Sequence, residues 1–402
     1  MRKKITFLSR FLLAVAIILT GILVIGNVRI KADETEAAGK IVRVKDTKEL
    51  TSAINDPEVD TIYFSTSVKK DFTIKANKNA KNKLLIFNAP NASFENKAVF
   101  GEIQILSVCD YVEKTSGNIY VFFNPNQIHS FTVAKKKTVK GMLFITDSTF
   151  NELYNFYVLR KGAKVEIVRF VYESADGGEE AEFDESKNEL SLKYTDPDGN
   201  PRSYTVKLDT RGRITKMISD ATFNFDYNFK YNKNGQKIKV SGSDDDDGKF
   251  TIIWKFDGNY ILSETFKGEV RTYEYKYRFK KGANYKCPLE VEYSSSSSEF
   301  GEEYWLKTYV YDKKNRFISC FTDFGDYNLE MINVYNKNDF LVKETYQYYT
   351  PDGEKYEDCS VITYEYNDAG DMIKRTFTYD TEESSAVYLY DDYGNLIDVK
   401  NE

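Results

Sequence analysis

The chain has 402 residues, of which 41% are hydrophobic and 15% aromatic, so it can bury a sizeable core and is not intrinsically disordered. It contains 31 Tyr and 28 Phe against 2 Trp and one His, and this bias favours sheets over helices. The formal net charge of -6 argues against nucleic acid and anionic lipid as partners, because an acidic surface repels both.

Residues 1–32 have the layout of a signal peptide. Four basic residues among the first ten precede an apolar run from Phe11 to Val28. The run is about as long as a bilayer-spanning helix, so an uncleaved anchor is the alternative, and membrane contact would then be confined to this segment. Cleavage after Ala32 removes six basic residues and no acid, which takes the formal charge from -6 to -12. The sequence therefore predicts a secreted, extracellular protein, associated with the cell surface if the segment is retained.

Residues 33–172 are predicted to form the first folded domain. Asp46 and Glu49 have the spacing of a capping box, and the apolar stripe of Leu50, Ala53 and Ile54 predicts a helix over 46–55. Short apolar runs then recur as far as residue 172, separated by polar turns rich in Asn. Runs this short and continuous predict strands that are buried on both faces.

Within this domain, residues 82–105 read NKLLIFNAPNASFENKAVFGEIQI. The segment resembles the rung pattern of pectate-lyase-like right-handed parallel β-helices. The resemblance implies stacked parallel strands over about residues 41–170, with the helix at 46–55 as an N-terminal cap. A β-sandwich is the alternative fold. β-Helices of this family include lyases and hydrolases that act on acidic polysaccharides, so an enzyme is retained as an alternative function.

Residues 173–190 combine Gly-Gly with a cluster of acids and are predicted to be a solvated acidic linker. A repeat domain is predicted over 191–402, in which an aromatic strand, an Asp or Asn, a turn and a second apolar strand recur eight times. Aromatic residues two apart lie on one face of a strand, so they should stack into an aromatic layer. The copies cover residues 206–214, 229–238, 254–262, 275–285, 309–318, 333–342, 364–373 and 388–397.

The turn of each copy has its own chemistry. Asp or Asn at the first turn position can accept hydrogen bonds from backbone amides two residues on, and a glycine three residues later can take positive φ. Each copy is therefore predicted to be a hairpin, and neighbouring hairpins should pair into one continuous curved sheet. The glycines in question are Gly212, Gly235, Gly370 and Gly394.

The array resembles the YD-repeat, or Rhs-type, family through Tyr311-Asp312, Tyr390-Asp391 and Gly394-Asn395-Leu396. The resemblance covers about residues 200–402. Arrays in that family form a β-shell around a cargo or build extracellular adhesive surfaces. Eight short copies are too few for a closed shell, so the resemblance favours a surface-binding role here.

Residues able to do chemistry are sparse. Asp60, Glu102 and Asp110 are isolated in sequence and are interpreted as turn caps, and His129 lacks a flanking nucleophile motif. The run Asp244–Asp247 lacks the spacing of an EF-hand and is interpreted, like Ser294–Ser298, as a solvent-exposed loop. Cys109, Cys287, Cys320 and Cys359 are too widely spaced for a zinc site, and no pairing is assigned to them. No catalytic residue, metal or cofactor is predicted.

Two tryptophans are candidate ligand-binding residues, because Trp on a rigid β-face can stack on sugar rings or peptide side chains. Trp305 follows two glutamates near a strand start, and Trp254 aligns with the repeat tyrosines, where core packing is the alternative. We therefore predict a non-catalytic secreted or cell-surface protein whose β-surface binds a glycan, an envelope component or another protein. The alternatives are a polysaccharide-active enzyme with its site on the β-helix, and a structural YD-repeat protein that covers another polypeptide. The last of these predicts a concave apolar face left uncovered.

Overall fold

The computed structural model describes residues 40–123, 127–146, 157–172, 179–180, 182–184, 188–195, 201–220, 224–280, 287–297, 301–380 and 382–401. The predicted signal peptide lies outside the described residues, so it stays a prediction. Among the described residues, no helix is long and apolar enough to cross a membrane.

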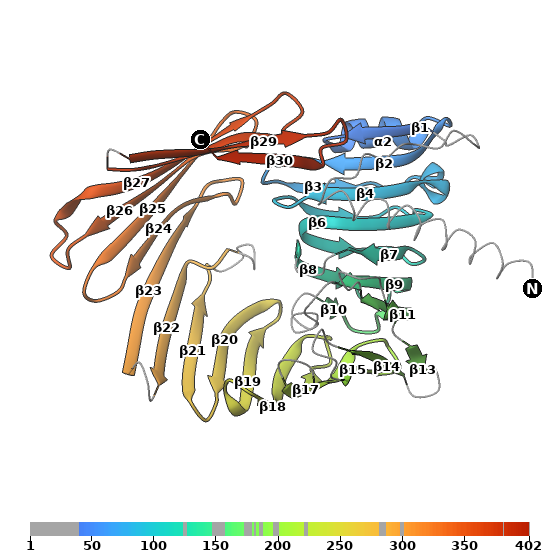
Figure 1. The fold of residues 1–402 in the computed structure, drawn as a ribbon, viewed down its shortest axis with the longest axis horizontal. Helices are drawn as coiled ribbons and strands as arrows, with labels where there is room; N and C mark the ends of the chain where they lie inside the picture. Colours follow the sequence, from blue (N-terminus) through green and yellow to red (C-terminus); the bar gives the residue numbers. More distant parts are fainter. Residues whose placement is uncertain are drawn as a thin grey trace, which may run out of the picture.

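Two sheets make up nearly all of the fold, as the sequence predicted. The described strands β1 to β11 pair in parallel, and β12 adds antiparallel to β11, whereas β13 to β30 form one antiparallel sheet in strict chain order. The parallel pairing of these strands confirms the predicted β-helix, and the alternative prediction of a β-sandwich is wrong. Figure 1 shows the parallel strands stacked as rungs and the antiparallel sheet curving away from them.

The β-helix has two sides. One contains β1 (Lys40–Val44), β2 (Val59–Ser65), β4 (Leu84–Ala89), β7 (Ile119–Phe122), β9 (Thr138–Thr146) and β11 (Lys164–Tyr172). The other contains β3 (Asp71–Ile74), β5 (Ser93–Asn96), β8 (Ile128–Val133) and β10 (Tyr157–Leu159), and the long β6 (Glu102–Glu113) belongs to both. A 3-10 helix, η1 (Lys78–Asn82), joins β3 to β4.

Large side chains in register fill the inside of the β-helix. Phe64, Phe87, Ile105, Phe122 and Phe144 follow one another from rung to rung on the first side, each at most 2% exposed. A second ladder on the other side consists of Phe72, Phe94, Tyr111 and Phe131. Burial of each of these large apolar side chains stabilises the stack by about 1.5–3 kcal/mol, which explains the continuous apolar runs in the sequence.

Helix α2 (Thr47–Asn55) covers the first rung, as predicted. Asp46 is its N-cap and accepts hydrogen bonds from the amides of Lys48 and Glu49, while Leu50, Ala53 and Ile54 are buried. The capping box is displaced by one residue, because Glu49 accepts from the amide of Lys45 rather than from that of Asp46. The helix closes the apolar end of the stack, which would otherwise be open to water.

The antiparallel sheet is built of consecutive hairpins. Its strands, together with the short β12 that precedes them, are β12 (Glu179–Glu180), β13 (Glu182–Asp184), β14 (Glu189–Thr195), β15 (Pro201–Leu208), β16 (Ile214–Asp220), β17 (Asn224–Tyr231), β18 (Lys237–Asp244), β19 (Gly248–Asp257), β20 (Tyr260–Lys267), β21 (Arg271–Arg278), β22 (Glu290–Ser297), β23 (Gly301–Tyr311), β24 (Phe317–Asp323), β25 (Asn328–Tyr335), β26 (Leu341–Tyr349), β27 (Lys355–Tyr366), β28 (Met372–Tyr379), β29 (Glu382–Tyr390) and β30 (Leu396–Asn401).

The turn between β29 and β30 shows how the repeat works. Asp391 Oδ1 accepts hydrogen bonds from the amides of Tyr393 and Asn395, and Gly394 has φ +83°. The same pair of side-chain hydrogen bonds recurs at Asp209, Asn232, Asp312 and Asn336. All four predicted glycines take positive φ, and Asn315 and Asp339 do so in the copies that have no glycine there. The turn predicted for the fourth copy includes residues 281–285, which lie outside the described residues.

In four of the repeats, the tyrosine just before the turn Asp or Asn ties the repeat to the hairpin before it. Its hydroxyl donates to the backbone carbonyl at the start of the previous hairpin's second strand, which gives a hydrogen bond worth about 1 kcal/mol. The pairs are Tyr231 with Ile214, Tyr335 with Phe317, Tyr366 with Leu341, and Tyr390 with Met372. The signature dipeptide therefore has two structural roles, an anchor and a turn cap.

At its start, the array docks on the last rungs of the β-helix. The Arg211 guanidinium donates to the carbonyls of Leu159, Arg160 and Ala163, and the Val165 amide donates to the Arg211 carbonyl. The next turn packs so closely that a β-carbon on Gly235 would overlap the Leu159 carbonyl oxygen. The two sheets thus meet through hairpin turns as well as through the chain itself.

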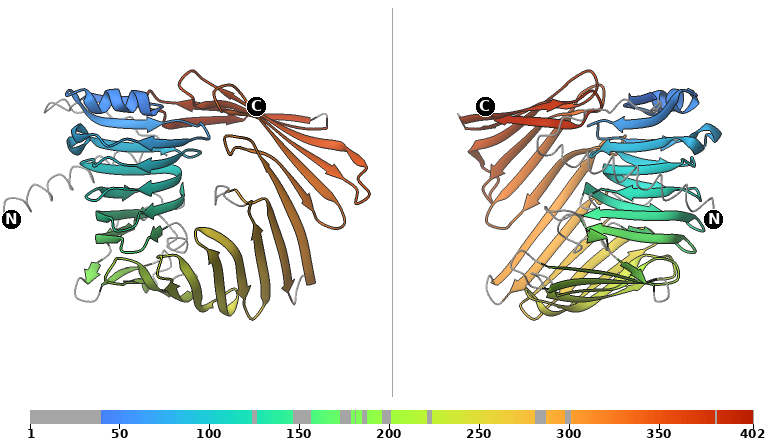
Figure 2. Two further views of the ribbon diagram at one scale, coloured as in Figure 1. Left: turned by 180° about the vertical axis from the view of Figure 1, so that it is seen from behind. Right: turned by 45° about the vertical axis from the view of Figure 1, so that its right-hand side comes forward.

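At its end, the array returns to the first strands of the β-helix. The turns 367–371 and 391–395 lie against β1, β2 and β4, where the Ser67 amide donates to the Gly370 carbonyl and Asn88 Nδ2 donates to the Gly394 carbonyl. Figures 1 and 2 both show β29 and β30 beside β1 and β2. The repeats do not close on themselves, but together with the β-helix they complete a ring, which the sequence did not predict.

Three loop predictions differ from the structure. Of the described residues of 173–190, residues 179–180, 182–184 and 189–190 belong to β12, β13 and β14, where the sequence predicted a solvated loop. Asp247 is 7% exposed and its two oxygens accept from the Arg271 guanidinium at 2.9 Å, so the acidic run does not simply project into solvent. Ser294–Ser297 belong to β22, and residue 298 lies outside the described residues. The domain boundaries themselves stay a prediction.

A pair of glycine variants tests the docking of turns on the β-helix. Gly235 has φ +85° and faces Leu159, whereas Gly353 has φ +87° in a turn of the same hydrogen-bond pattern, and a β-carbon there would meet nothing within 4 Å. We expect Gly353→Ala to cost about 1–2 kcal/mol, the strain of a left-handed alanine. Gly235→Ala should cost clearly more in the free energy of unfolding, measured in urea. Equal costs would show that the Gly235 turn does not contact the β-helix in solution.

Candidate functional site

One face of the antiparallel sheet carries the repeat tyrosines. Cross-strand register connects Tyr227, Phe250, Phe266, Tyr273 and their partners into a single face that continues through Trp305 and Tyr309 to Tyr388 and Tyr390. We call it the tyrosine face. The opposite face carries most of the charged side chains of β21 and β22, among them Lys276, Glu274 and Glu292.

Burial of the tyrosine face changes along the sheet. In β14 to β20 this face is in the core that it shares with the β-helix; Met217, Val240 and Phe266 are at most 4% exposed. From β21 onward most of the same face is half buried or exposed, and Phe377 and Tyr379 are 37% and 43% exposed. A few positions on it are still at most 7% exposed, namely Val291, Cys320 and Ile362. The accessible part therefore begins where the β-helix no longer covers the sheet.

An aromatic ladder connects the two parts, as the sequence predicted. Phe266 stacks on Tyr273 with ring centroids 4.9 Å apart, and Tyr275 lies 4.8 Å from Tyr293. Tyr293 stacks on Trp305 at 4.9 Å with an interplanar angle of 20°. The rings run from the buried core to the accessible sheet without interruption, which holds the outer rings in place.

Trp305 lies at the accessible end of this ladder. It is half buried in β23, its ring contacts Tyr293 and Tyr275, and the Lys307 ammonium lies 4.6 Å from its ring centroid. The sequence identified Trp305 but missed Tyr275 and Tyr293, although their spacing within paired strands could have indicated them. Together these residues form a rigid aromatic surface with a cation over the Trp305 ring.

Trp254 is the other predicted residue, and it lies closer to the β-helix. Its indole N–H donates to Glu264 Oε2 at 2.7 Å, and the Lys237 ammonium lies 4.4 Å from the ring centroid. Tyr273 donates its hydroxyl to the other oxygen of Glu264 at 3.3 Å. Lys237 lies over the Trp254 ring as Lys307 lies over the Trp305 ring, so this contact does not distinguish the two tryptophans. The binding role of both tryptophans stays a prediction.

Burial shifts the titration of this face. It lowers the pKa of Lys237 to about 7, against the attraction of the Glu264 carboxylate. It raises the pKa of the hydroxyls of Tyr309, Tyr366 and Tyr390 to about 12. The tyrosines are therefore neutral at physiological pH, and the face offers aromatic rings and hydroxyl groups rather than phenolate charges.

The other residues singled out in the sequence lie on the β-helix. The His129 side chain is 81% exposed and its Nδ1 lies 2.9 Å from Asp110 Oδ1, and Ser130 donates its hydroxyl to the same carboxylate. Glu102 accepts from Gln104 at 2.7 Å, and burial raises its pKa. Asp60 is exposed on β2. Among the described residues, no group of three or more His, Cys, Asp or Glu side chains is placed to hold a metal ion.

The similarity of this chain to known proteins is confined to solved structures at low sequence identity. No protein-family model and no curated protein matches the sequence. Among solved structures, the crystal structures of TcdB2-TccC3-Cdc42 and TcdB2-TccC3-TEV match with 10% and 13% identity and TM-scores of 0.27 and 0.24. Each match covers 54% of this chain and 15% of the other, so it concerns a small part of those proteins. A porin-like protein from Bacteroides uniformis ATCC 8492 matches with 10% identity and a TM-score of 0.24, covering 54% of this chain and 93% of the other. The chain is a β-repeat protein, and its ligand does not follow from these matches.

The pKa of Lys237 predicts a pH dependence of stability. The native amine releases its proton near pH 7 and the unfolded amine near pH 10.4, so between these values the unfolded chain binds the extra proton and stability rises with pH. Lys237→Met should flatten this rise between pH 7 and pH 9 in urea unfolding. Lys239→Met, on the opposite face of the same strand, is the control. An unchanged slope in Lys237→Met would contradict the burial of the amine.

Proposed function

We propose that this chain is an exported, non-catalytic β-repeat protein of the YD type that binds a ligand on the tyrosine face of β21 to β30. One observation supports this most: the face that forms the core in β14 to β20 continues into strands where the β-helix no longer covers it. A single-layer sheet with many half-buried aromatic rings is unusual for a surface without a partner. The basic, then apolar, first residues support export.

The chemistry of the face favours a ligand with flat, weakly charged surfaces. The stacked rings of Tyr293 and Trp305 offer aromatic carbon to the ligand, and the Lys307 ammonium over the Trp305 ring adds a hydrogen-bond donor. Sugar rings stack on aromatic side chains in this way, and so do extended peptides. A glycan or another envelope component is therefore the leading ligand class, with a protein as the alternative within the same function.

A role in covering another polypeptide is the second candidate. It requires an apolar inner face left open in the isolated chain, and the half-exposed tyrosine face has that property from β21 to β30. The ring that the array forms with the β-helix is also compatible with this role, although eight repeats alone do not surround a cargo.

A polysaccharide-active enzyme is less well supported. It would need carboxylates that converge in a groove on the β-helix. Asp110 is occupied by Ser130 and His129, and Glu102 by Gln104, and the two acids lie on different sides of the β-helix, in separate parts of the long strand β6. Product analysis in a binding experiment would detect cleavage if it occurred.

The test is binding of residues 33–402 to a panel of glycans and cell-wall polymers, with product analysis in the same wells. We expect saturable binding without cleavage, and an affinity about tenfold or more weaker in Trp305→Ala and Tyr293→Ala, because truncation of a central aromatic contact costs about 1.4 kcal/mol or more. Phe321→Ser is the matched control, since Phe321 is 42% exposed on the opposite face of β24.

Three results would change the proposal. Equal weakening by Phe321→Ser would place the ligand elsewhere on the sheet. New reducing ends or unsaturated products would favour the enzyme. Binding to no polymer in the panel would remove the glycan as ligand and direct the search to protein partners.

A further inference from the structure

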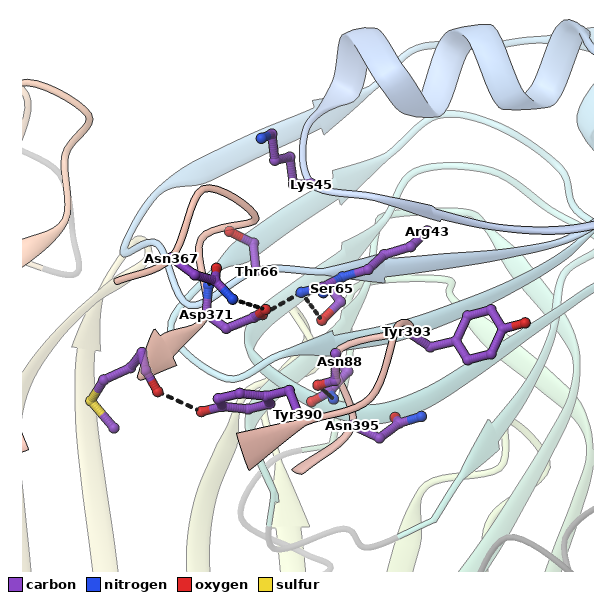
Figure 3. Close-up of polar contacts among 12 residues, drawn as sticks. Arg43, Lys45, Ser65, Thr66, Asn88, Asn367, Asp371, Tyr390, Tyr393 and Asn395 are labelled. Carbon is purple, nitrogen blue, oxygen red and sulfur yellow. Dashed lines mark hydrogen bonds and ion pairs between the residues drawn. The ribbon is translucent and has the colours of Figure 1, made fainter. Parts of the chain in front are cut away.

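The contact that completes the ring is made by few residues. On the β-helix they are Arg43 of β1 and Lys45 just after it, Tyr63, Ser65 and Ser67 in and after β2, and Asn88 of β4. On the array they are the last two repeat turns, 367–371 and 391–395. We call this contact the latch, and Figure 3 shows its polar groups.

An ion pair lies at the centre of the latch. Arg43 Nη2 contacts Asp371 Oδ1 and also donates to Ser65 Oγ at 3.3 Å. Asn367 holds the Asp371 carboxylate in place by donating from Nδ2 at 3.0 Å. The side chains of Arg43 and Asp371 are 15% and 4% exposed, and Arg43 Nε is buried with no hydrogen-bond partner. A buried pair with an unsatisfied donor adds little net stability, because desolvation offsets most of the attraction.

The remaining latch contacts are also mostly polar. Lys45 Nζ donates to the Asp368 carbonyl at 2.7 Å, and the Ser67 amide donates to Gly370 at 3.1 Å. Tyr63 and Tyr393 add one ring contact at 5.3 Å. A β-carbon on Gly394 would overlap Ser65 Oγ, so the fit is close. Water can replace each of these hydrogen bonds when the surfaces separate.

The opposite end of the array is attached in a different way. There the chain is continuous, and strands β14 to β20 contribute Val206, Met217 and Phe229 to the same buried core as Leu159 and Val165 of the β-helix. Of the described residues beyond Tyr273, only Phe340 packs against that core. Separation at this end would expose a large apolar surface, which costs about 25 cal/mol per Å². Separation at the latch exposes much less.

We propose that the latch is reversible: the ring opens between the last two repeat turns and the first rungs of the β-helix, while the array stays attached at its start. Opening would widen access to the tyrosine face for a long ligand, and this purpose rests on the proposed function. The opening itself does not, because it can be measured in the chain without ligand.

Amide hydrogen exchange compares the two ends directly. The Ser67 amide reports the latch, since it donates to Gly370, and the Val165 amide reports the attached end, since it donates to Arg211. In the unmodified chain under native conditions, we expect Ser67 to exchange at least about tenfold faster than Val165, corrected for intrinsic rates. Equal protection of the two amides would overturn the proposal, because both ends would then open only together.

Charge variants test whether the ion pair holds the latch. Arg43→Asp and Asp371→Arg should each speed exchange at Ser67 about tenfold and leave Val165 unchanged, and the double variant R43D/D371R should restore part of the protection. Acceleration at both amides, or no effect at either, would contradict the proposed role of the pair.

Gly394→Ala is an independent test that introduces no charge. Gly353→Ala is its control, because Gly353 also has a positive φ, +87°, but has open space around it. Only Gly394→Ala should open the latch. If the two variants leave Ser67 equally protected, the turn 391–395 does not hold the ring closed and the proposal fails. None of these outcomes depends on whether a ligand has been found.

Discussion

The packing of β14 to β20 against the last rungs of the β-helix is the interaction on which the rest of the structure depends. A stack of parallel rungs has two open apolar ends. Helix α2 covers the first end, and the tyrosine face of the early repeats covers the other. One buried core therefore joins a parallel and an antiparallel sheet that would each be incomplete alone. It also fixes where the repeat array begins and the direction in which it leaves the β-helix.

The later repeats are stabilised by their neighbours rather than by a core. In the last four repeats a turn Asp or Asn holds the hairpin, and in the last three a tyrosine hydroxyl also reaches back to the previous hairpin, so the array behaves as a chain of local contacts. Such a sheet can be one layer thick and still keep its shape. Its tyrosine face stays accessible, and the β-helix connects the two ends of the array at the same time. The binding function that we propose uses this accessible face, and the reversible latch that we propose controls access to it.

Local patterns in the sequence were sufficient to predict much of this. Continuous apolar runs such as Leu84–Phe87 indicated rungs, and Asp391 with Gly394 indicated a hairpin turn, because both depend on neighbours in sequence. The ring was not predictable in this way. Arg43 and Asp371 are 328 residues apart in the sequence, and no local motif around either residue indicates that the two form an ion pair. The same holds for Asp247, whose partner Arg271 belongs to another hairpin and turns an apparently solvated acid into a buried one. Of the candidate site, the tryptophans were predictable by residue type, whereas the tyrosines around Trp305 required the strand register.

The shared core is tested most directly by calorimetry of the full chain with one buried ring removed from each sheet. Phe87 is in the β-helix and 0% exposed, and Phe250 is in the array and 7% exposed. Phe87→Ala and Phe250→Ala should each cost about 3–5 kcal/mol and lower the midpoint of the same thermal transition, because β1 to β11 and β14 to β20 unfold together. If instead two thermal transitions were seen, and Phe250→Ala lowered the midpoint of one while Phe87→Ala lowered the midpoint of the other, the two sheets would have independent cores. That result would contradict a shared core.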